Sequence, residues 1–150
     1  MEVFRICHEK YANRLTSSGS ANRWNFQGQN VIYTGSSRSL STLELVVHRN
    51  AIVPTFLYKV MVISIADEDR LIKQVRLSEL PLDWRSLNAY SKLQRMGSEW
   101  YHHQETLMLK VPSAVISQEY DYVINTEHPD FASKVQLVRT ENYFWDNRLL

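Results

Sequence analysis

The chain has 150 residues, of which 44% are hydrophobic and 22% charged, a composition that is typical of globular proteins and excludes a disordered or fibrous chain. Its formal net charge of +1 argues against a dedicated binder of nucleic acids or of anionic membranes. A single cysteine excludes an intramolecular disulfide, and the longest apolar run, residues 60–66, is far shorter than the ~20 residues that span a bilayer. We expect a soluble, cytoplasmic, single domain comprising residues 1–150.

Short apolar segments rich in β-branched and aromatic residues predict strands along the chain. In order they cover about residues 3–6, 31–33, 56–65, 71–77, 106–111, 122–125 and 135–138. A polar turn at 67–69 joins the third segment to the fourth, which predicts a hairpin. Helices are expected over about 39–49 and 86–102, the second interrupted at Gly97.

The spacing of these elements indicates the fold class. Regular helices do not separate the strands, which argues against a parallel doubly wound sheet. We expect an α+β fold with a mixed, largely antiparallel sheet and flanking helices. A polar loop over 13–30 and a turn at 34–37 are expected before the first helix. Pro54 is expected to interrupt regular secondary structure after that helix.

The first helix carries a carboxylate at an unusual place. Ser41 and Glu44 match a capping box, which would explain the carboxylate as part of the helix start. Spacings of three and four also put Glu44 on one stripe with Leu40, Leu43 and Val47. Because an unpaired carboxylate is costly on an apolar face, Glu44 would then need an interior partner or a ligand pocket. Both readings stay open on this pattern.

Two further groups of residues are candidates for a binding site. The loop segment 23–28 holds Arg23, two aromatic residues and two amides, which suit an anion and a flat ring; alternatively, its aromatics only pin the loop to the core. Ser113 follows a proline at the end of a strand, and Asn125 ends the next strand. Either polar residue could equally be a turn former.

Several chemistries lack their motifs. The four glycines form neither a dinucleotide fingerprint nor a P-loop, and no Gly-x-Ser-x-Gly elbow is present. The five histidines include no pair spaced by four, and one cysteine cannot form a zinc knuckle. We expect no metal site.

Taken together, the candidate residues resemble those of the RES-domain family in type and order. The first half carries Arg5, Arg23-Trp24-Asn25, Gly28, Tyr33, Ser36/Ser37, Leu43-Glu44 and His48. The second half carries Gly97-Ser98-Glu99-Trp100, Leu109 to Ala114, Glu119, Asn125, His128-Pro129-Asp130-Phe131 and Asp146 to Leu149. The arginine, glutamate and serine that name the family match Arg23, Glu44 and Ser113. The chain departs from the pattern at Thr126, where proline is common, and at Asp121, where asparagine is frequent.

The resemblance implies a toxin of a bacterial type II toxin–antitoxin module, with a fold similar to ADP-ribosyltransferase toxins. Such a protein binds NAD+ as its substrate and cleaves the nicotinamide–ribose bond, with water or phosphate as the acceptor. The resemblance implies these site residues: catalytic Arg23, Tyr33, Glu44 and Ser113, and NAD-binding Arg5, Arg23, Tyr33, Ser36 and Asn125. Glu44 would stabilise the positive charge on ribose, Arg5 and Arg23 would hold the pyrophosphate, and Tyr33 would stack on nicotinamide. Ser113 would orient the ribose or the attacking group.

The resemblance also implies partners and leaves alternatives. We expect an antitoxin with an Xre-like helix-turn-helix that covers the pocket, and a homodimer. A protein mono-ADP-ribosyltransferase is the alternative within the same chemistry. An alternative of another class is a non-catalytic interaction module whose polar loop and tryptophans, at 84, 100 and 145, form a partner interface. A ribonuclease toxin fits poorly with the near-neutral charge.

Overall fold

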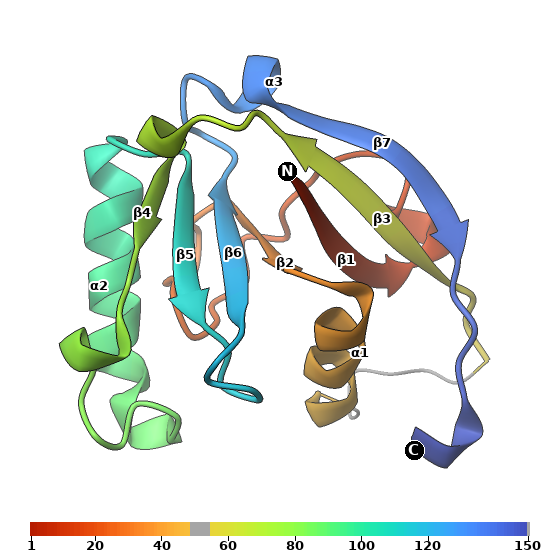
Figure 1. The fold of residues 1–150 in the computed structure, drawn as a ribbon, viewed down its shortest axis with the longest axis horizontal. Coiled ribbons are helices and arrows are strands. Elements are labelled where there is room, and N and C mark those ends of the chain that lie inside the picture. The colour runs from red at the N-terminus through yellow and green to blue at the C-terminus, as the bar shows by residue number, and fades with distance from the viewer. Residues whose placement is uncertain (49–54, 150) are drawn as a thin grey trace.

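One seven-stranded sheet organises residues 1–48 and 55–149, which the computed structural model describes. In chain order the strands are β1 (Glu2–His8), β2 (Val31–Gly35), β3 (Tyr58–Ile65), β4 (Ile72–Gln74), β5 (Met108–Pro112), β6 (Tyr120–Asn125) and β7 (Val135–Asn142). They lie side by side in the order β4-β5-β6-β2-β1-β3-β7 (Figure 1). Among these described strands only β4 and β5 pair in parallel. The predicted α+β fold with a mixed, largely antiparallel sheet is therefore confirmed.

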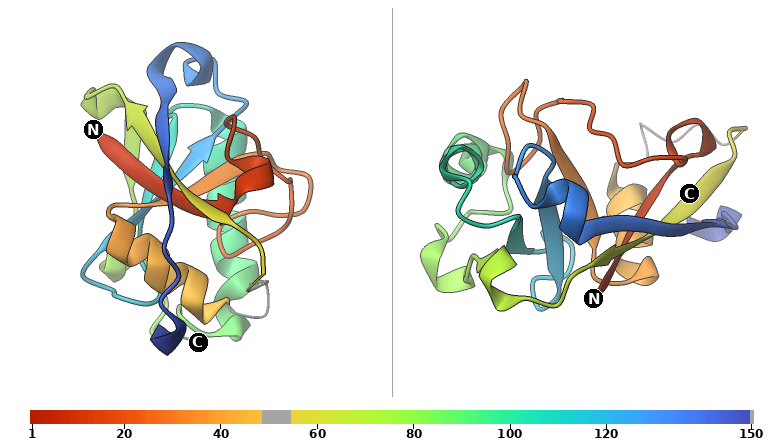
Figure 2. Two further views of the ribbon diagram at one scale, coloured as in Figure 1. Left: turned by 90° about the vertical axis from the view of Figure 1, so that its right-hand side faces the viewer. Right: turned by 90° about the horizontal axis from the view of Figure 1, so that it is seen from above.

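The helices flank the sheet. They are α1 (Arg38–Val47), α2 (Tyr90–His103) and α3 (Phe131–Lys134), with short 3-10 helices η1 (Glu9–Tyr11), η3 (Asp69–Leu71), η4 (Leu77–Glu79), η5 (Leu87–Ala89) and η6 (Asn147–Leu149). Figure 2 shows α1 and α2 standing apart from one another beside the sheet. No helix within the described part of the chain is long and apolar enough to cross a membrane.

Alternation along β2 explains how both faces of the sheet are covered. Ile32 belongs to the core cluster on one face of the sheet, together with Met61 and Ile124. Val31 belongs to the cluster on the other face, together with Leu93 of α2. Side chains two residues apart share a face. A Cβ on residue 35 would point at Ser41 of α1. Both helices therefore lie over the same face of β2, and space remains between them.

The hairpin predicted for β3 and β4 is wrong. β3 pairs with β1 and β7, whereas β4 pairs with β5 at the opposite edge of the sheet. Between them, Glu68 forms ion pairs with Arg70 and Lys134, which fix the turn at the top of the sheet. Leu71, which follows, is fully buried in the core. Period-two alternation predicts a strand but carries no information about its partner.

The first helix begins at Arg38, close to the predicted residue 39, but the capping box predicted at Ser41 and Glu44 does not form. Ser37 is the N-cap, and its Oγ accepts a hydrogen bond from the backbone N of Leu40 at 3.0 Å. Ser41 lies one turn further on, and its hydroxyl contacts the carbonyl oxygen of Phe4 at 3.0 Å. Thr34 and Gly35, expected in a turn, continue β2. The expected helix end at residue 49 and the break at Pro54 lie outside the described residues.

The interruption predicted at Gly97 does not occur, because α2 runs through it without a break. The glycine allows a close approach instead. A Cβ on residue 97 would lie 1.8 Å from the carbonyl oxygen of Trp24, in the loop over 13–30. Gly97 thus joins α2 to the loop segment that carries Arg23. That loop contains no helix or strand beyond an isolated bridge between Asn22 and Asn25, as expected.

We predict that Gly97→Ala destabilises the protein. In an open helix this change stabilises by about 1 kcal/mol, but here the methyl group would overlap a backbone oxygen, and overpacking costs about 1–3 kcal/mol or more. Urea denaturation would measure the free energy of unfolding. Ser91→Ala, at an exposed position of the same helix, is the control. A Gly97→Ala variant as stable as the wild type would contradict the close packing.

Candidate active site

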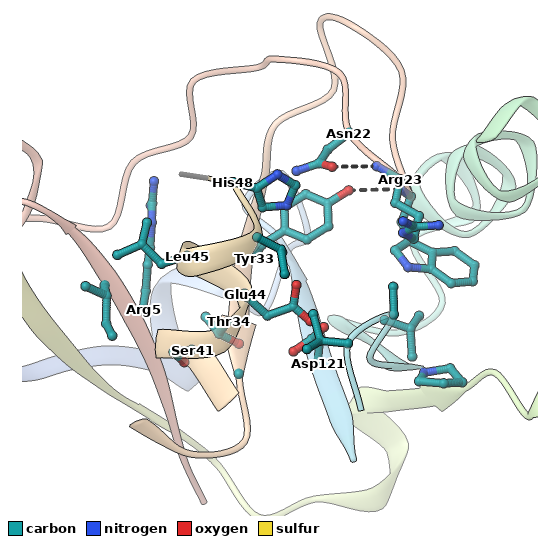
Figure 3. A pocket seen from close by; sticks show the side chains of 18 of the residues that line it. Arg5, Asn22, Arg23, Tyr33, Thr34, Ser41, Glu44, Leu45, His48 and Asp121 are labelled. Atoms are coloured by element: carbon teal, nitrogen blue, oxygen red, sulfur yellow. Dashed lines mark hydrogen bonds between the residues drawn. The ribbon is translucent and has the colours of Figure 1, made fainter. Parts of the chain in front are cut away.

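A cavity of about 650 Å³ opens between α1 and the loop that carries Arg23 (Figure 3). Its volume lies within the range of roughly 300–1,000 Å³ that is usual for small-molecule sites. Its lining combines cations, carboxyls and aromatic rings. The polar and aromatic members are Arg5, Asn22, Arg23, Trp24, Tyr33, Thr34, Ser41, Glu44, His48, Arg85, Tyr90 and Asp121.

Glu44 lines this cavity, and Ser113, which is fully buried and does not itself line the cavity, contacts Glu44 from behind although 69 residues separate the two in the chain. The Ser113 hydroxyl donates to Oε1 of Glu44 at 2.6 Å. Of the stripe predicted around Glu44, Leu40 is buried, but Leu43 and Val47 are 37% and 57% exposed. Glu44 therefore faces the cavity rather than an apolar core, and it does not serve as the cap of its own helix.

The direction of the Ser113 hydroxyl is set by its surroundings. Ser113 follows Pro112, the last residue of β5, and its backbone N donates to the carbonyl oxygen of Glu119 at 2.9 Å. The backbone amides of Val115 and Ile116 donate to its Oγ at 3.1 and 3.2 Å. With the oxygen's acceptor capacity taken up by two amides, its proton points to Glu44. The carboxylate is held by a donor that cannot easily turn away.

Helix α1 can approach the sheet because of Gly35. A Cβ there would lie 2.6 Å from Oγ of Ser41 and 3.2 Å from its backbone N. The Ser41 hydroxyl in turn contacts the Phe4 carbonyl of β1. These contacts fix the second turn of α1 against β1 and β2, and Glu44 lies one turn further along.

A second carboxyl group faces Glu44. Asp121 lies on β6 opposite Gly35 of β2 and Val111 of β5, and it lines the cavity. Burial, the negative charge of Glu44 and a hydrogen bond with its side chain together raise the pKa of Asp121 well above its ordinary value. Figure 3 shows the two carboxyl groups side by side. Two carboxyls this close cannot both ionise without a large cost in free energy.

The cations of the cavity are held apart from these carboxyls. The guanidinium of Arg23 lies over the ring of Tyr90, 4.8 Å from its centroid, and donates to the Trp84 carbonyl at 3.0 Å. Arg5 donates to the Thr16 carbonyl at 3.1 Å. Arg85 donates to the Ala114 carbonyl at 2.8 Å. Each of these bonds is to a neutral carbonyl oxygen, so none of them cancels the positive charge of its arginine.

Tyr33 ties the loop to the sheet. Its hydroxyl donates to Oδ1 of Asn25 at 2.6 Å and accepts from the backbone N of Trp24 at 3.0 Å. Burial raises the pKa of Tyr33, so its hydroxyl stays protonated. With both of these bonds made inside the protein, the ring is the part of Tyr33 that remains for a ligand.

The structure does not bring Ser36 or Asn125 to the cavity. Ser36 is exposed just before α1, and neither residue is among the described residues that line the space. Asn125 is fully buried at the end of β6, where its amide donates to the Tyr101 carbonyl and its Oδ1 accepts from the backbone N of Glu127. It closes the corner after β6.

Sequence reasoning missed several cavity residues, among them Asp121, Arg85 and Tyr90. Alternation along β6 puts Asp121 on the same face as buried Val123, and this signal could have found it. Arg85 lies in the irregular segment before α2, and Tyr90 is the first residue of that helix, so no periodicity points either side chain to a cavity.

The arrangement suits a small, anionic, partly aromatic ligand. Three arginines can bind phosphate oxygens, an aromatic ring can contact a flat group, and a fixed carboxylate can stabilise a developing positive charge. Among residues 1–48 and 55–149, no three His, Cys, Asp or Glu residues gather in a way that could hold a metal ion.

Comparison with known proteins identifies the family. A profile of the RES domain matches residues 2–146. "Toxin Res" of Yersinia enterocolitica is 30% identical over 153 residues, covering 99% of this chain and 99% of that protein. "Prs ADP-ribosylating toxin" of Sphingobium sp. is 33% identical over 144 residues, covering 93% of this chain and 88% of that protein.

A solved structure has the same fold. A chain of the M. tuberculosis MbcT–MbcA toxin–antitoxin complex matches with a TM-score of 0.75 at 18% identity, over 95% of this chain and 83% of that chain. Sequence profile, curated toxins and fold agree over nearly the full length, and the chain therefore belongs to the RES domain family.

Proposed function

We propose that this chain is the toxin of a toxin–antitoxin module, and that it binds NAD+ in the cavity and cleaves the bond between nicotinamide and ribose. The observation that carries the proposal is the Glu44 carboxylate, held by Ser113 at the edge of a cavity that also contains three arginines. The curated relatives named as toxins support the biological role.

The chemistry needs a carboxylate at this place. When the bond between nicotinamide nitrogen and ribose C1′ breaks, its electron pair leaves with nicotinamide, which becomes neutral. The ribose acquires the positive charge of an oxocarbenium-like transition state. A carboxylate fixed beside the sugar stabilises this charge as it forms, and the stabilisation is greater in the transition state than in bound NAD+. Glu44 has this role in the proposal, with Ser113 as the donor that orients it.

The remaining cavity residues suit the rest of NAD+. The pyrophosphate carries negative charge, and the planar guanidinium groups of Arg5, Arg23 and Arg85 can bind its oxygens. The ring of Tyr33 is available to stack on nicotinamide, since its hydroxyl is bonded to the loop. Ser36 and Asn125, which lie outside the cavity lining, have no part in this binding mode.

The acceptor of the ADP-ribosyl group distinguishes the candidate reactions. Water would give ADP-ribose and phosphate would give ADP-ribose-1″-phosphate. Each attack, on the anomeric carbon that carried nicotinamide, returns one proton to solvent. A protein side chain is the alternative, and the Sphingobium relative named as an ADP-ribosylating toxin favours it. The open cavity is compatible with all three.

An antitoxin is the partner that this function implies. The related M. tuberculosis chain was solved in a toxin–antitoxin complex, which supports a cognate antitoxin here. An Xre-like helix-turn-helix in that antitoxin, a homodimer of this chain and a cytoplasmic site of action remain proposals from the family resemblance.

We predict that Glu44→Gln lowers turnover by about 10²–10³-fold, because it removes the negative charge while keeping size and the acceptor for Ser113. Nicotinamide release from NAD+ would measure it. Glu99→Gln, at an exposed glutamate of α2, is the matched control. Near-native turnover of Glu44→Gln would contradict the proposed role of Glu44 in stabilising the charge on ribose.

We predict that NAD+ raises the melting temperature of the wild type, since a ligand specific for the folded state stabilises it by about 2.7 kcal/mol at 100 times Kd. Arg23→Lys should show a smaller shift, because lysine lacks the planar fork. Arg95→Lys, on the exposed side of α2, should match the wild type. No shift in the wild type would favour the non-catalytic interaction module.

We predict that the products identify the acceptor. Mass spectrometry of NAD+ reactions with and without phosphate should find ADP-ribose or ADP-ribose-1″-phosphate beside nicotinamide. If purified protein leaves NAD+ intact in both buffers, labelled NAD+ in a cell lysate should transfer its label to protein. Unlabelled protein in that lysate would contradict the ADP-ribosyltransferase alternative as well.

A further inference from the structure

We propose that Asp121 is a positioning residue for Glu44, to whose carboxylate its own carboxyl group donates a hydrogen bond. The inference rests on the proposed function only for its effect on turnover, because the pairing itself is a property of the folded chain. It assigns a role to the aspartate at which this chain departs from the family pattern.

The surroundings of Asp121 favour its neutral form. Its Oδ1 is buried and receives no hydrogen bond from any described residue. An ionised carboxylate left in this way would pay the full cost of desolvation. The three cavity arginines, at positions 5, 23 and 85, bond to backbone carbonyls instead.

The charged side chains of Glu44 and Glu119 oppose the ionisation of Asp121. Glu44 acts from α1 and Glu119 from the segment before β6, and both place negative charge nearby. From β2, Tyr33 faces it as a neutral phenol. From β5, the paired residue is apolar Val111. A proton on Asp121 relieves this repulsion and supplies a donor to the neighbouring carboxylate.

The pair completes the fixation of Glu44. Ser113 donates to Oε1 from just after β5, and the protonated Asp121 supplies a second donor from β6. These two donors hold one carboxylate with a single net negative charge. As pH rises through the raised pKa of Asp121, the pair gains a second negative charge, the hydrogen bond is lost, and Glu44 is pushed from its place.

The pairing is tested first without any assay of turnover. Carbon-13 NMR of side-chain-labelled aspartate, with Asp121 assigned by its loss in Asp121→Asn, would follow its protonation. We expect the carboxyl to be protonated at neutral pH, and its pKa to fall by about one unit or more in Glu44→Gln, where a neutral amide replaces the charged acceptor. Glu119→Gln, a change outside the pair, should lower that pKa by less. An Asp121 that is ionised at neutral pH in the wild type would overturn the inference.

Turnover then tests positioning. Asp121→Ala should lower kcat about tenfold, the worth of one well-placed hydrogen bond, and Asp121→Asn, whose amide can still donate, should recover part of this loss. The wild type should lose turnover at alkaline pH, whereas Asp121→Asn should lack that limb. If turnover of Asp121→Asn still falls at alkaline pH, the proton on Asp121 does not position Glu44. If neither the wild type nor any variant releases nicotinamide while the NMR titration is as expected, the proposed function is wrong but the pairing of Asp121 with Glu44 is confirmed.

Discussion

The hydrogen bond between Ser113 and Glu44 is the contact on which the arrangement of the cavity depends. It joins the middle of α1, which packs on β2, to the residue that follows β5. Two backbone amides fix the serine oxygen, and the N-cap at Ser37 together with the Ser41 contact fixes the helix. A carboxylate at 2.6 Å from a donor held in this way has little rotational freedom left to lose when a ligand arrives.

The distribution of charge follows from the same geometry. The carboxyl of Glu44 on α1 meets that of Asp121 near the start of β6. The arginines reach the cavity from β1 and from the two loops. The side chains of Arg5 and Arg23 lie on opposite sides of Glu44 in Figure 3. A chain that is almost neutral overall can therefore place a group of cations and a pair of carboxyls within one cavity. Net charge reports on the whole surface and says little about such a local separation.

Two glycines allow close backbone approaches next to the cavity. Gly35 lets α1 rest on β2, and Gly97 lets α2 rest on the backbone of Trp24. Between these two contacts the loop carrying Arg23 is anchored by the buried Trp24 side chain and by the bonds of Tyr33. Trp84 and Trp100 are buried in one hydrophobic cluster and Trp145 is half-buried, so none of the three is the fully exposed anchor that was expected for an interaction module.

The sequence by itself determined the secondary-structure elements and several polar side chains of the cavity, because periodicity, composition and residue type act locally along the chain. It predicted all seven strands, the α+β class and the residues Arg23, Tyr33, Glu44 and Ser113, which the structure brings to or beside one cavity. Only the tertiary structure decided the parallel pairing of β4 with β5, the true N-cap of α1 and the passage of α2 through Gly97. It also decided that Asn125 closes a corner and that Asp121 faces Glu44. Strand partners, close backbone approaches and the pairing of two carboxyls depend on which distant segments meet, and no local pattern records that.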